Sequence, residues 1–179
     1  MRAVVCGVVG AAVLAGCGRT EEGGSAGPTT SDALELFNPC RGALSDAVLT
    51  SVGLDPATKG VLTDPPTGPS AWRVCDWMPL DDRYGSGSRS VSVFSTSFTL
   101  DQARQKESAT VIGETTVNSR AGLISKERSD RESCYVSFEA EQGMFEINVA
   151  WLSTEGAHVG DTCEMAAKYA AALEPHLPK

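Results

Sequence analysis

The sequence predicts an α+β domain: a mostly antiparallel sheet of about five or six strands, with packed terminal helices and two disulfides. Residues 134–140 and 145–151 are apolar at alternate positions and are joined through a Gln-Gly pair, which is typical of an antiparallel hairpin with one face in the core. Residues 161–173 follow with the spacing of an amphipathic helix. Asp161 and Glu164 have capping-box spacing, so we expect the helix to begin there. The predicted domain, residues 33–179, contains the cysteines Cys40, Cys75, Cys134 and Cys163.

Further strands are predicted where β-branched and aromatic residues concentrate. They cover residues 72–80, 89–98, 108–117 and 120–126. The stretch 63–70 contains three prolines and predicts a loop, and the polar stretch 81–88 with two glycines predicts a turn.

Short helical segments are predicted before and between these strands. The Asn-Pro pair within residues 37–40 indicates a capped turn, and residues 46–52 follow a capping serine. Thr99 and Gln102 have the spacing of a capping box, which predicts a surface helix over residues 100–107.

The cysteine pattern favours two disulfides over a zinc site or free thiols. The four cysteines named above are even in number and have no C-x-x-C spacing, and the chain has only two histidines. Three pairings are possible, and the sequence alone does not choose among them. We favour Cys40–Cys75 with Cys134–Cys163, because each pair then closes one half of the domain separately, worth roughly 3 to 4 kcal/mol per loop in the chain-entropy model.

The amino-terminal segment has the pattern of an export signal. Residues 3–15 are apolar or small and end at Leu-Ala-Gly-Cys, and this run is shorter than the ~20 apolar residues of a membrane-spanning helix. We therefore expect residues 1–16 to be a signal peptide, with lipid attached to the sulfur of Cys17. The alternative is an ordinary secretory signal in which Cys17 is incidental.

The segment 17–32 is predicted to be a flexible tether, because after Cys17 it contains no aliphatic residue larger than alanine. Residues 33–179 then form a single disulfide-stapled domain. The formal net charge of -8 argues against nucleic acid as a partner, and it gives no attraction to anionic lipid headgroups. Attachment to the extracytoplasmic face of the cell membrane therefore has to come from the lipid anchor.

Five features together resemble one known family. They are FNPC at 37–40, GLDP at 53–56, WRVCDW at 72–77, the late Cys134, and Cys163 at the start of a helix that ends in LEPHLP. This combination resembles an actinobacterial lipoprotein family described as domain of unknown function DUF3558. The resemblance implies an envelope lipoprotein with paired cysteines. It does not indicate which activity the protein has or which residues are functional.

Motifs for catalysis or metal binding are missing from the sequence. His158 and His176 are the only histidines, and neither lies in a nucleophile, zinc or phosphate-binding motif. Asp81 and Asp82 are either a cation or sugar site or a solvated turn. We expect no catalytic residues, no metal and no cofactor.

Trp72 and Trp77 are the candidate recognition residues. They are an odd number of positions apart on one predicted strand, so they face opposite sides of the sheet. One ring is then core, and the other is exposed beside the proline-rich loop, where an aromatic ring suits recognition. The competing interpretation is that helices cover both faces and bury both rings.

These patterns favour a non-enzymatic binding or accessory module of the cell envelope, whose partner is an envelope protein, a lipid or a cell-wall ligand. One alternative is an envelope hydrolase that uses Asp/Glu pairs. Another is a lipoprotein that captures or senses a small ligand in one pocket between sheet and helices.

Overall fold

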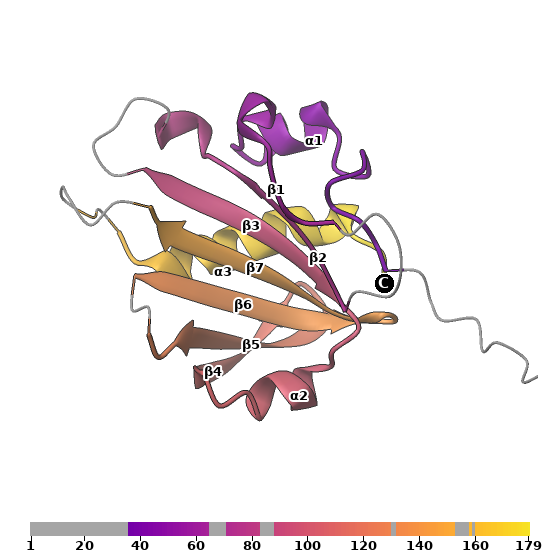
Figure 1. Ribbon diagram of the computed structural model, residues 1–179, viewed down its shortest axis with the longest axis vertical. Coiled ribbons are helices and arrows are strands. Elements are labelled where there is room, and N and C mark those ends of the chain that lie inside the picture. Colours follow the sequence, from indigo (N-terminus) through magenta and orange to yellow (C-terminus); the bar gives the residue numbers. More distant parts are fainter. Residues whose placement is uncertain (1–35, 65–70, 83–87, 130–131, 153–157, 159) are drawn as a thin grey trace, which may run out of the picture. The chain divides into compact units, whose positions relative to one another are not determined.

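Seven antiparallel strands form one sheet in the computed structural model (Figure 1), in the order β1-β2-β3-β7-β6-β5-β4. The structure describes residues 36–64, 71–82, 88–129, 132–152, 158 and 160–179. The strands are β1 (Gly60–Thr63), β2 (Trp72–Trp77), β3 (Arg89–Thr96), β4 (Ala109–Val117), β5 (Arg120–Glu127), β6 (Ser133–Ala140) and β7 (Gly143–Trp151). The predicted signal peptide, the tether and Cys17 lie outside the described residues.

The predicted fold class is confirmed, with one strand more than expected. The additional strand is β1, an edge strand of four residues that pairs only with β2. It is too short to show an alternating pattern, and its side chains Val61 and Leu62 are exposed. A Cβ atom at Gly60 would collide with the carboxyl group of Asp76 on the neighbouring strand, so a larger residue there would require that side chain to move.

Three α-helices flank the sheet, and each begins at a side-chain cap. They are α1 (Asp46–Ser51), α2 (Leu100–Arg104) and α3 (Thr162–Leu173), with short 3-10 turns at Pro56–Thr58, Leu80–Asp82 and Glu174–His176. The capping box of Thr99 and Gln102 is present as predicted, and Asp161 accepts hydrogen bonds from the first turn of α3. Helix α2 ends earlier than predicted, because the amides of Gln105 and Lys106 turn back to carbonyls three residues earlier.

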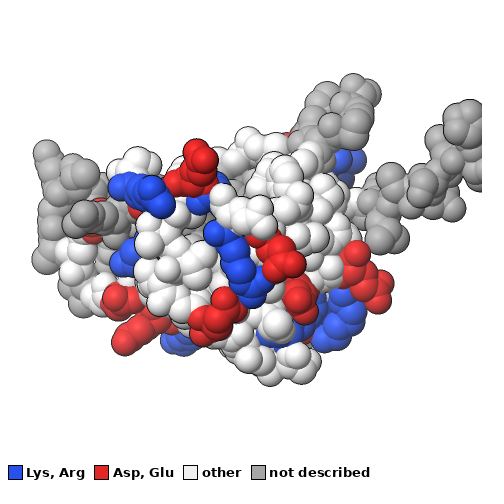
Figure 2. Space-filling view, turned by 90° about the horizontal axis from the view of Figure 1, so that it is seen from below, with Lys and Arg blue, Asp and Glu red and all other residues white. Residues whose placement is uncertain are grey.

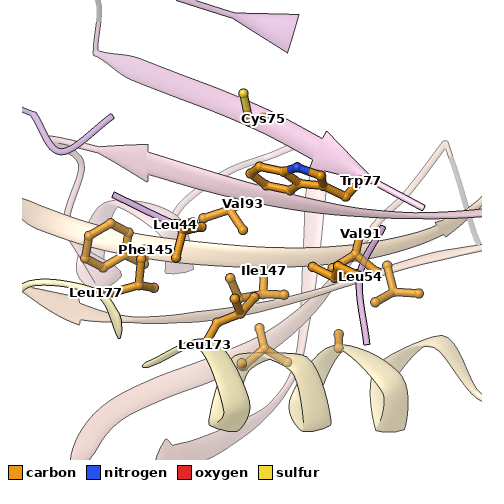
Figure 3. Packing of buried hydrophobic residues seen from close by; sticks show 14 of the residues in the cluster. Leu44, Leu54, Cys75, Trp77, Val91, Val93, Phe145, Ile147, Leu173 and Leu177 are labelled. Carbon is orange, nitrogen blue, oxygen red and sulfur yellow. The ribbon is translucent and has the colours of Figure 1, made fainter. Parts of the chain in front are cut away.

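The main core lies between the sheet and α3. Figure 3 shows Val91, Val93 and Ile147 on the strands directed toward Leu173 of the helix. The predicted hairpin supplies much of this core, because β6 and β7 pair in register from Ser133↔Ala150 to Ala140↔Gly143. The alternating apolar positions of both strands therefore reach α3 together.

Both disulfides have the favoured pairing. Cys40–Cys75 joins the capped turn at 37–40 to β2, with 5.4 Å between the Cα atoms. Cys134–Cys163 joins β6 to the first turn of α3, with 5.0 Å between the Cα atoms. Each bond ties a segment at one end of the domain to the central sheet.

Candidate ligand-binding site

The two faces of the sheet are covered differently. Helix α3 passes behind β6 and β7 in Figure 1, so the face toward the reader is the one that α3 leaves free. Trp77 points to the α3 face and is 1% exposed, whereas Trp72, on the opposite face, is half-buried. The prediction that the two tryptophans face opposite sides is confirmed. We call the face that carries Trp72 the open face.

A pocket of about 640 Å³ lies on the open face, beside α2. Cross-strand pairing brings its floor together, because Trp72 on β2 lies opposite Thr96 on β3, which in turn lies opposite Met144 on β7. One row further along the strands, Phe94 of β3 lies opposite Glu146 of β7. The volume is in the range of small-molecule sites in proteins.

Aromatic rings form the wall of this pocket. The ring centroids of Trp72 and Phe94 are 5.8 Å apart with an edge-to-face angle of 86°. Phe98 adds a ring 5.6 Å from Trp72, and Tyr135 adds one 6.1 Å from Phe94. These spacings are those of favourable aromatic pairs, so the rings support one another in a fixed arrangement. We call these four rings the aromatic wall, and the pocket that they line the aromatic pocket.

Among the described residues that line the pocket, Glu146 is the acidic one. It is 8% exposed, and burial raises the pKa of its carboxyl above the usual value. The hydroxyl of Ser137 on β6 donates a hydrogen bond of 2.8 Å to Oε2 of Glu146 and opposes this rise, as does the charge of Lys106. Glu127 raises the pKa further. The surroundings of Glu146 therefore disfavour the ionised form of its carboxyl.

Lys106, just after α2, lines the same pocket, but its charge is already paired. Its ammonium group bonds the carboxylate of Glu127 on β5 and lies 6.0 Å from the ring centre of Tyr135. Figure 2 shows the molecule from the side of α2 and β4, where basic and acidic side chains alternate over the surface. Arg104 follows this pattern with its ion pairs to Asp101 and Glu114. No single sign of charge dominates the visible surface on this side.

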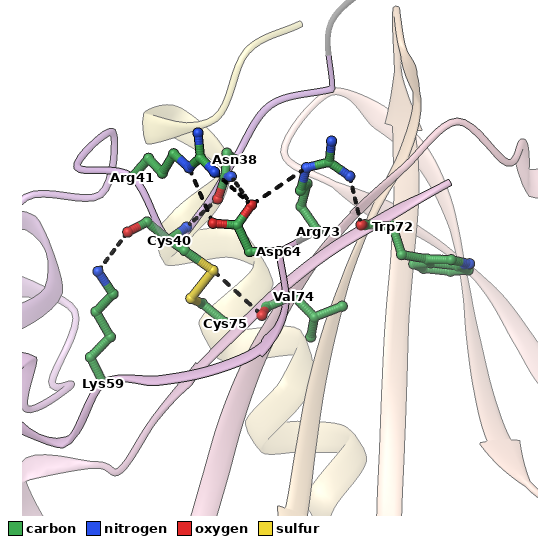
Figure 4. A network of polar contacts seen from close by, with 9 residues as sticks. All are labelled: Asn38, Cys40, Arg41, Lys59, Asp64, Trp72, Arg73, Val74 and Cys75. Atoms are coloured by element: carbon green, nitrogen blue, oxygen red, sulfur yellow. Dashed lines mark hydrogen bonds and ion pairs between the residues drawn. A yellow bond between two sulfur atoms is a disulfide. The ribbon is translucent and has the colours of Figure 1, made fainter. Parts of the chain in front are cut away.

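A polar network fixes the strand that carries Trp72. Asp64 accepts hydrogen bonds from Asn38 at 2.9 Å and from Arg41 at 3.1 Å, and Arg73 lies 3.8 Å away as an ion partner. The bond from Arg41 is the main reason that the pKa of Asp64 is lowered. Figure 4 shows this network beside the Cys40–Cys75 disulfide, with the ring of Trp72 pointing away from it. The network and the disulfide thus hold β2 on one side, while the tryptophan projects from the other.

A second buried glutamate, Glu174, lies at the carboxyl end of α3 and has several partners. It accepts hydrogen bonds from Arg120 at 2.7 Å, from Lys179 at 2.8 Å and from Asn118 at 2.7 Å. The bonds from Lys179 and Asn118 contribute most to lowering its pKa from 4.5 to about 2. Arg120 also donates to the carbonyls of Leu177 and Pro178, so this cluster fastens the end of the chain to β5.

Another hollow, of about 570 Å³, lies next to that cluster. Its acidic residues Asp101, Glu139 and Glu141 are exposed. Exposed carboxylates lack the apolar surroundings that tune a general acid. We therefore place the candidate site in the aromatic pocket and not here.

Of the remaining sequence candidates, Asp81, Asp82 and His158 have local partners. Asp81 and Asp82 form ion pairs with Arg89, at 2.9 Å and 3.3 Å. Their carboxylates are therefore already paired with a cation of the protein. The ring of His158 stacks on that of Trp151 with 4.8 Å between centroids, and His176 is exposed. Among the described residues, no three His, Cys, Asp or Glu side chains are grouped to hold a metal ion.

Sequence reasoning found Trp72 but missed the rest of the pocket. Phe94, Tyr135 and Glu146 all stand at outward positions of their strands, where alternation predicts contact with solvent. The polar residue Glu146 between Phe145 and Ile147 reads as an ordinary solvated position of an amphipathic strand. Its burial comes from the neighbouring strands and α2, which no local pattern reveals.

Comparison with known proteins gives a match to one family model. No curated protein and no solved structure matches the chain. Among the described residues, no helix has the length and apolar character needed to cross a membrane. The model of one family, described as "Protein of unknown function (DUF3558)", matches residues 12–176, and the chain therefore belongs to the DUF3558 family.

Proposed function

We propose that the protein is a lipoprotein of the extracytoplasmic membrane face, whose domain is a non-enzymatic module that binds a small amphipathic ligand in the aromatic pocket. The observation that carries the binding proposal is the pocket itself. It joins apolar rings to one buried carboxyl, and this is the composition of sites that hold an apolar body and orient one polar group. This proposal combines the predicted envelope location with the alternative of small-ligand capture.

The supports of the pocket favour a preformed site. Trp72 extends from a strand held by the Asp64 network and by the Cys40–Cys75 disulfide. The β6–β7 turn is also fitted closely, since a Cβ atom at Gly143 would lie 2.5 Å from the carbonyl oxygen of Thr96. A rigid site loses little conformational entropy when a ligand binds, which favours affinity.

Trp72 gives the first test of the binding proposal. The chain from residue 17 onward, carrying Cys17→Ser, is titrated with the neutral fluorescent probe phenylnaphthylamine. We expect saturable binding, with an affinity that Trp72→Ala lowers by about tenfold or more, because the variant removes one ring of the wall. Trp151→Ala is the matched control, since that ring stacks on His158 elsewhere. Absence of saturable binding, or equal effects of the two variants, would refute the proposed site.

The location rests on the leader pattern that ends at Cys17 and has its own test. Cells that express the full chain are labelled with palmitate and fractionated. We expect labelled protein in the membrane fraction and loss of both label and membrane association in Cys17→Ser, because two acyl chains hold firmly where one binds only marginally. An unlabelled native protein, or one recovered in the culture medium, would overturn the anchoring proposal and leave the pocket unaffected.

A further inference from the structure

We infer that the pocket selects a ligand with a protonated amine, which pairs with the carboxylate of Glu146 while the aromatic wall holds the apolar part. This inference rests on the proposed binding function, and it adds the chemical class of the ligand. It follows from three features of the described residues: a buried acid that forms no ion pair, aromatic rings that line the same pocket, and a nearby lysine whose ammonium group pairs with another carboxylate.

The first feature is the incomplete bonding of Glu146. Within the described part of the chain, the only hydrogen bond to its carboxyl comes from Ser137, and no ion pair reaches it. Glu174, buried to a similar degree, has three side chains as donors. A buried carboxylate is costly unless a cation or several donors compensate it, so Glu146 has bonding capacity left for a ligand.

The second feature is the aromatic wall. Trp72 and Phe98 come from one side of the pocket, and Phe94 and Tyr135 line the sheet beside Glu146. The face of an aromatic ring attracts a cation, and tryptophan does so most strongly. Rings and carboxyl thus favour the same sign of ligand charge, whereas an anionic ligand would meet repulsion from both.

The third feature is the position of Lys106. An unpaired lysine at the pocket would attract anions, but this ammonium group bonds Glu127 and lies over Tyr135. Besides burial, the pKa of Glu146 is shifted by the hydroxyl of Ser137 and by the charges of Lys106 and Glu127. Since Lys106 and Glu127 have opposite charges, the uncompensated charge in the pocket is that of Glu146 once it ionises.

Binding of an amine should therefore be linked to release of a proton. Burial raises the pKa of Glu146, and a bound cation favours the ionised carboxyl and lowers that pKa again. The affinity for an amine should rise as the pH rises from about 5 to about 8, while the affinity for a neutral ligand should not follow this trend.

The experiment compares three probes with one ring body and different head groups: naphthylmethylamine, naphthylmethanol and naphthylacetate. Affinities are measured by titration calorimetry over that pH range, in buffers of different ionisation enthalpy, so that proton release is counted. We expect the amine to bind most tightly and the carboxylate most weakly. Glu146→Gln should weaken amine binding by about 10- to 100-fold, the size of a charge-assisted hydrogen bond, and leave the alcohol nearly unchanged.

Glu139→Gln is the matched control, because it removes the same charge at an exposed position of the neighbouring strand β6. Equal affinity for the three probes in the unaltered protein would overturn the amine inference and leave the proposed binding function standing. Failure of the alcohol and of the neutral fluorescent probe to bind would instead refute the pocket as a ligand site. Equal effects of Glu146→Gln and Glu139→Gln on amine binding would also overturn the inference. The lost affinity would then come from the overall charge of the protein and not from contact with Glu146.

Discussion

Glu174 and Glu146 are both buried, yet the fold treats them in opposite ways. Three side chains donate to Glu174, and its pKa falls to about 2. One hydroxyl donates to Glu146, and burial raises its pKa. The first carboxylate has an evident structural purpose, since it fastens the end of the chain to β5 through Arg120. Ionisation of Glu146 lowers the stability of the folded protein, and carboxyls with such perturbed pKa values concentrate at functional sites.

The largest expected effect follows from breaking the cluster around Glu174. Arg120→Met removes one of the three donors to the buried Glu174 carboxylate and also the arginine that donates to the carbonyls of Leu177 and Pro178. We expect the free energy of unfolding to fall by about 3 to 5 kcal/mol. Chemical denaturation measures this change. Arg104→Met removes an exposed arginine that also has ion pairs, and should change stability little. Similar losses in both variants would show that the cluster around Glu174 does not stabilise the fold more than an exposed ion pair does.

A smaller effect is expected from acid. The folded-state pKa of Glu174 is lowered, so its contribution is fully present above the unfolded value of 4.5 and is lost as the pH falls toward about 2. Unfolding measured across this range should show the loss in the unaltered protein and a flatter profile in Glu174→Gln. Parallel profiles of the two proteins would contradict the low pKa.

The smallest effect, and one of opposite sign, is expected at Glu146. Because its pKa is raised in the folded protein, ionisation costs stability as the pH rises above the ordinary glutamate value of 4.5. Glu146→Gln should therefore match the unaltered protein in acid and become more stable at higher pH, by less than the loss expected in Arg120→Met. Thermal unfolding at several pH values measures this gain. A loss of stability in this variant at neutral pH would mean that Glu146 serves the fold and not a ligand.

The parts of the fold that follow local rules were predictable. The hairpin of β6 and β7 has alternating apolar positions over both strands, and α3 begins at a side-chain cap. The favoured cysteine pairing was also correct, because it links segments that are close in sequence. Strand β1 could not be predicted, since its four residues depend on pairing with β2 and not on a pattern of their own.

Only part of the candidate site was predictable. Trp72 and Trp77 were expected on opposite faces from their spacing, and the structure places them so. The pocket around Trp72 could not be foreseen, because Phe94, Tyr135 and Glu146 come from three strands and have no shared motif. Their proximity is a consequence of register between strands that are distant in sequence.

Sequence patterns alone predict the fold class and the placement of the two tryptophans on opposite faces of the sheet, and they favour one of the three possible cysteine pairings. These depend on alternation, capping and chain closure, which are properties of nearby residues or of their spacing. Only the tertiary structure shows that Glu174 has three donor side chains and that Glu146 is buried at the wall of a pocket. Burial and electrostatic partners are set by residues from other strands and helices, so a polar side chain at an outward position gives no local sign of its state.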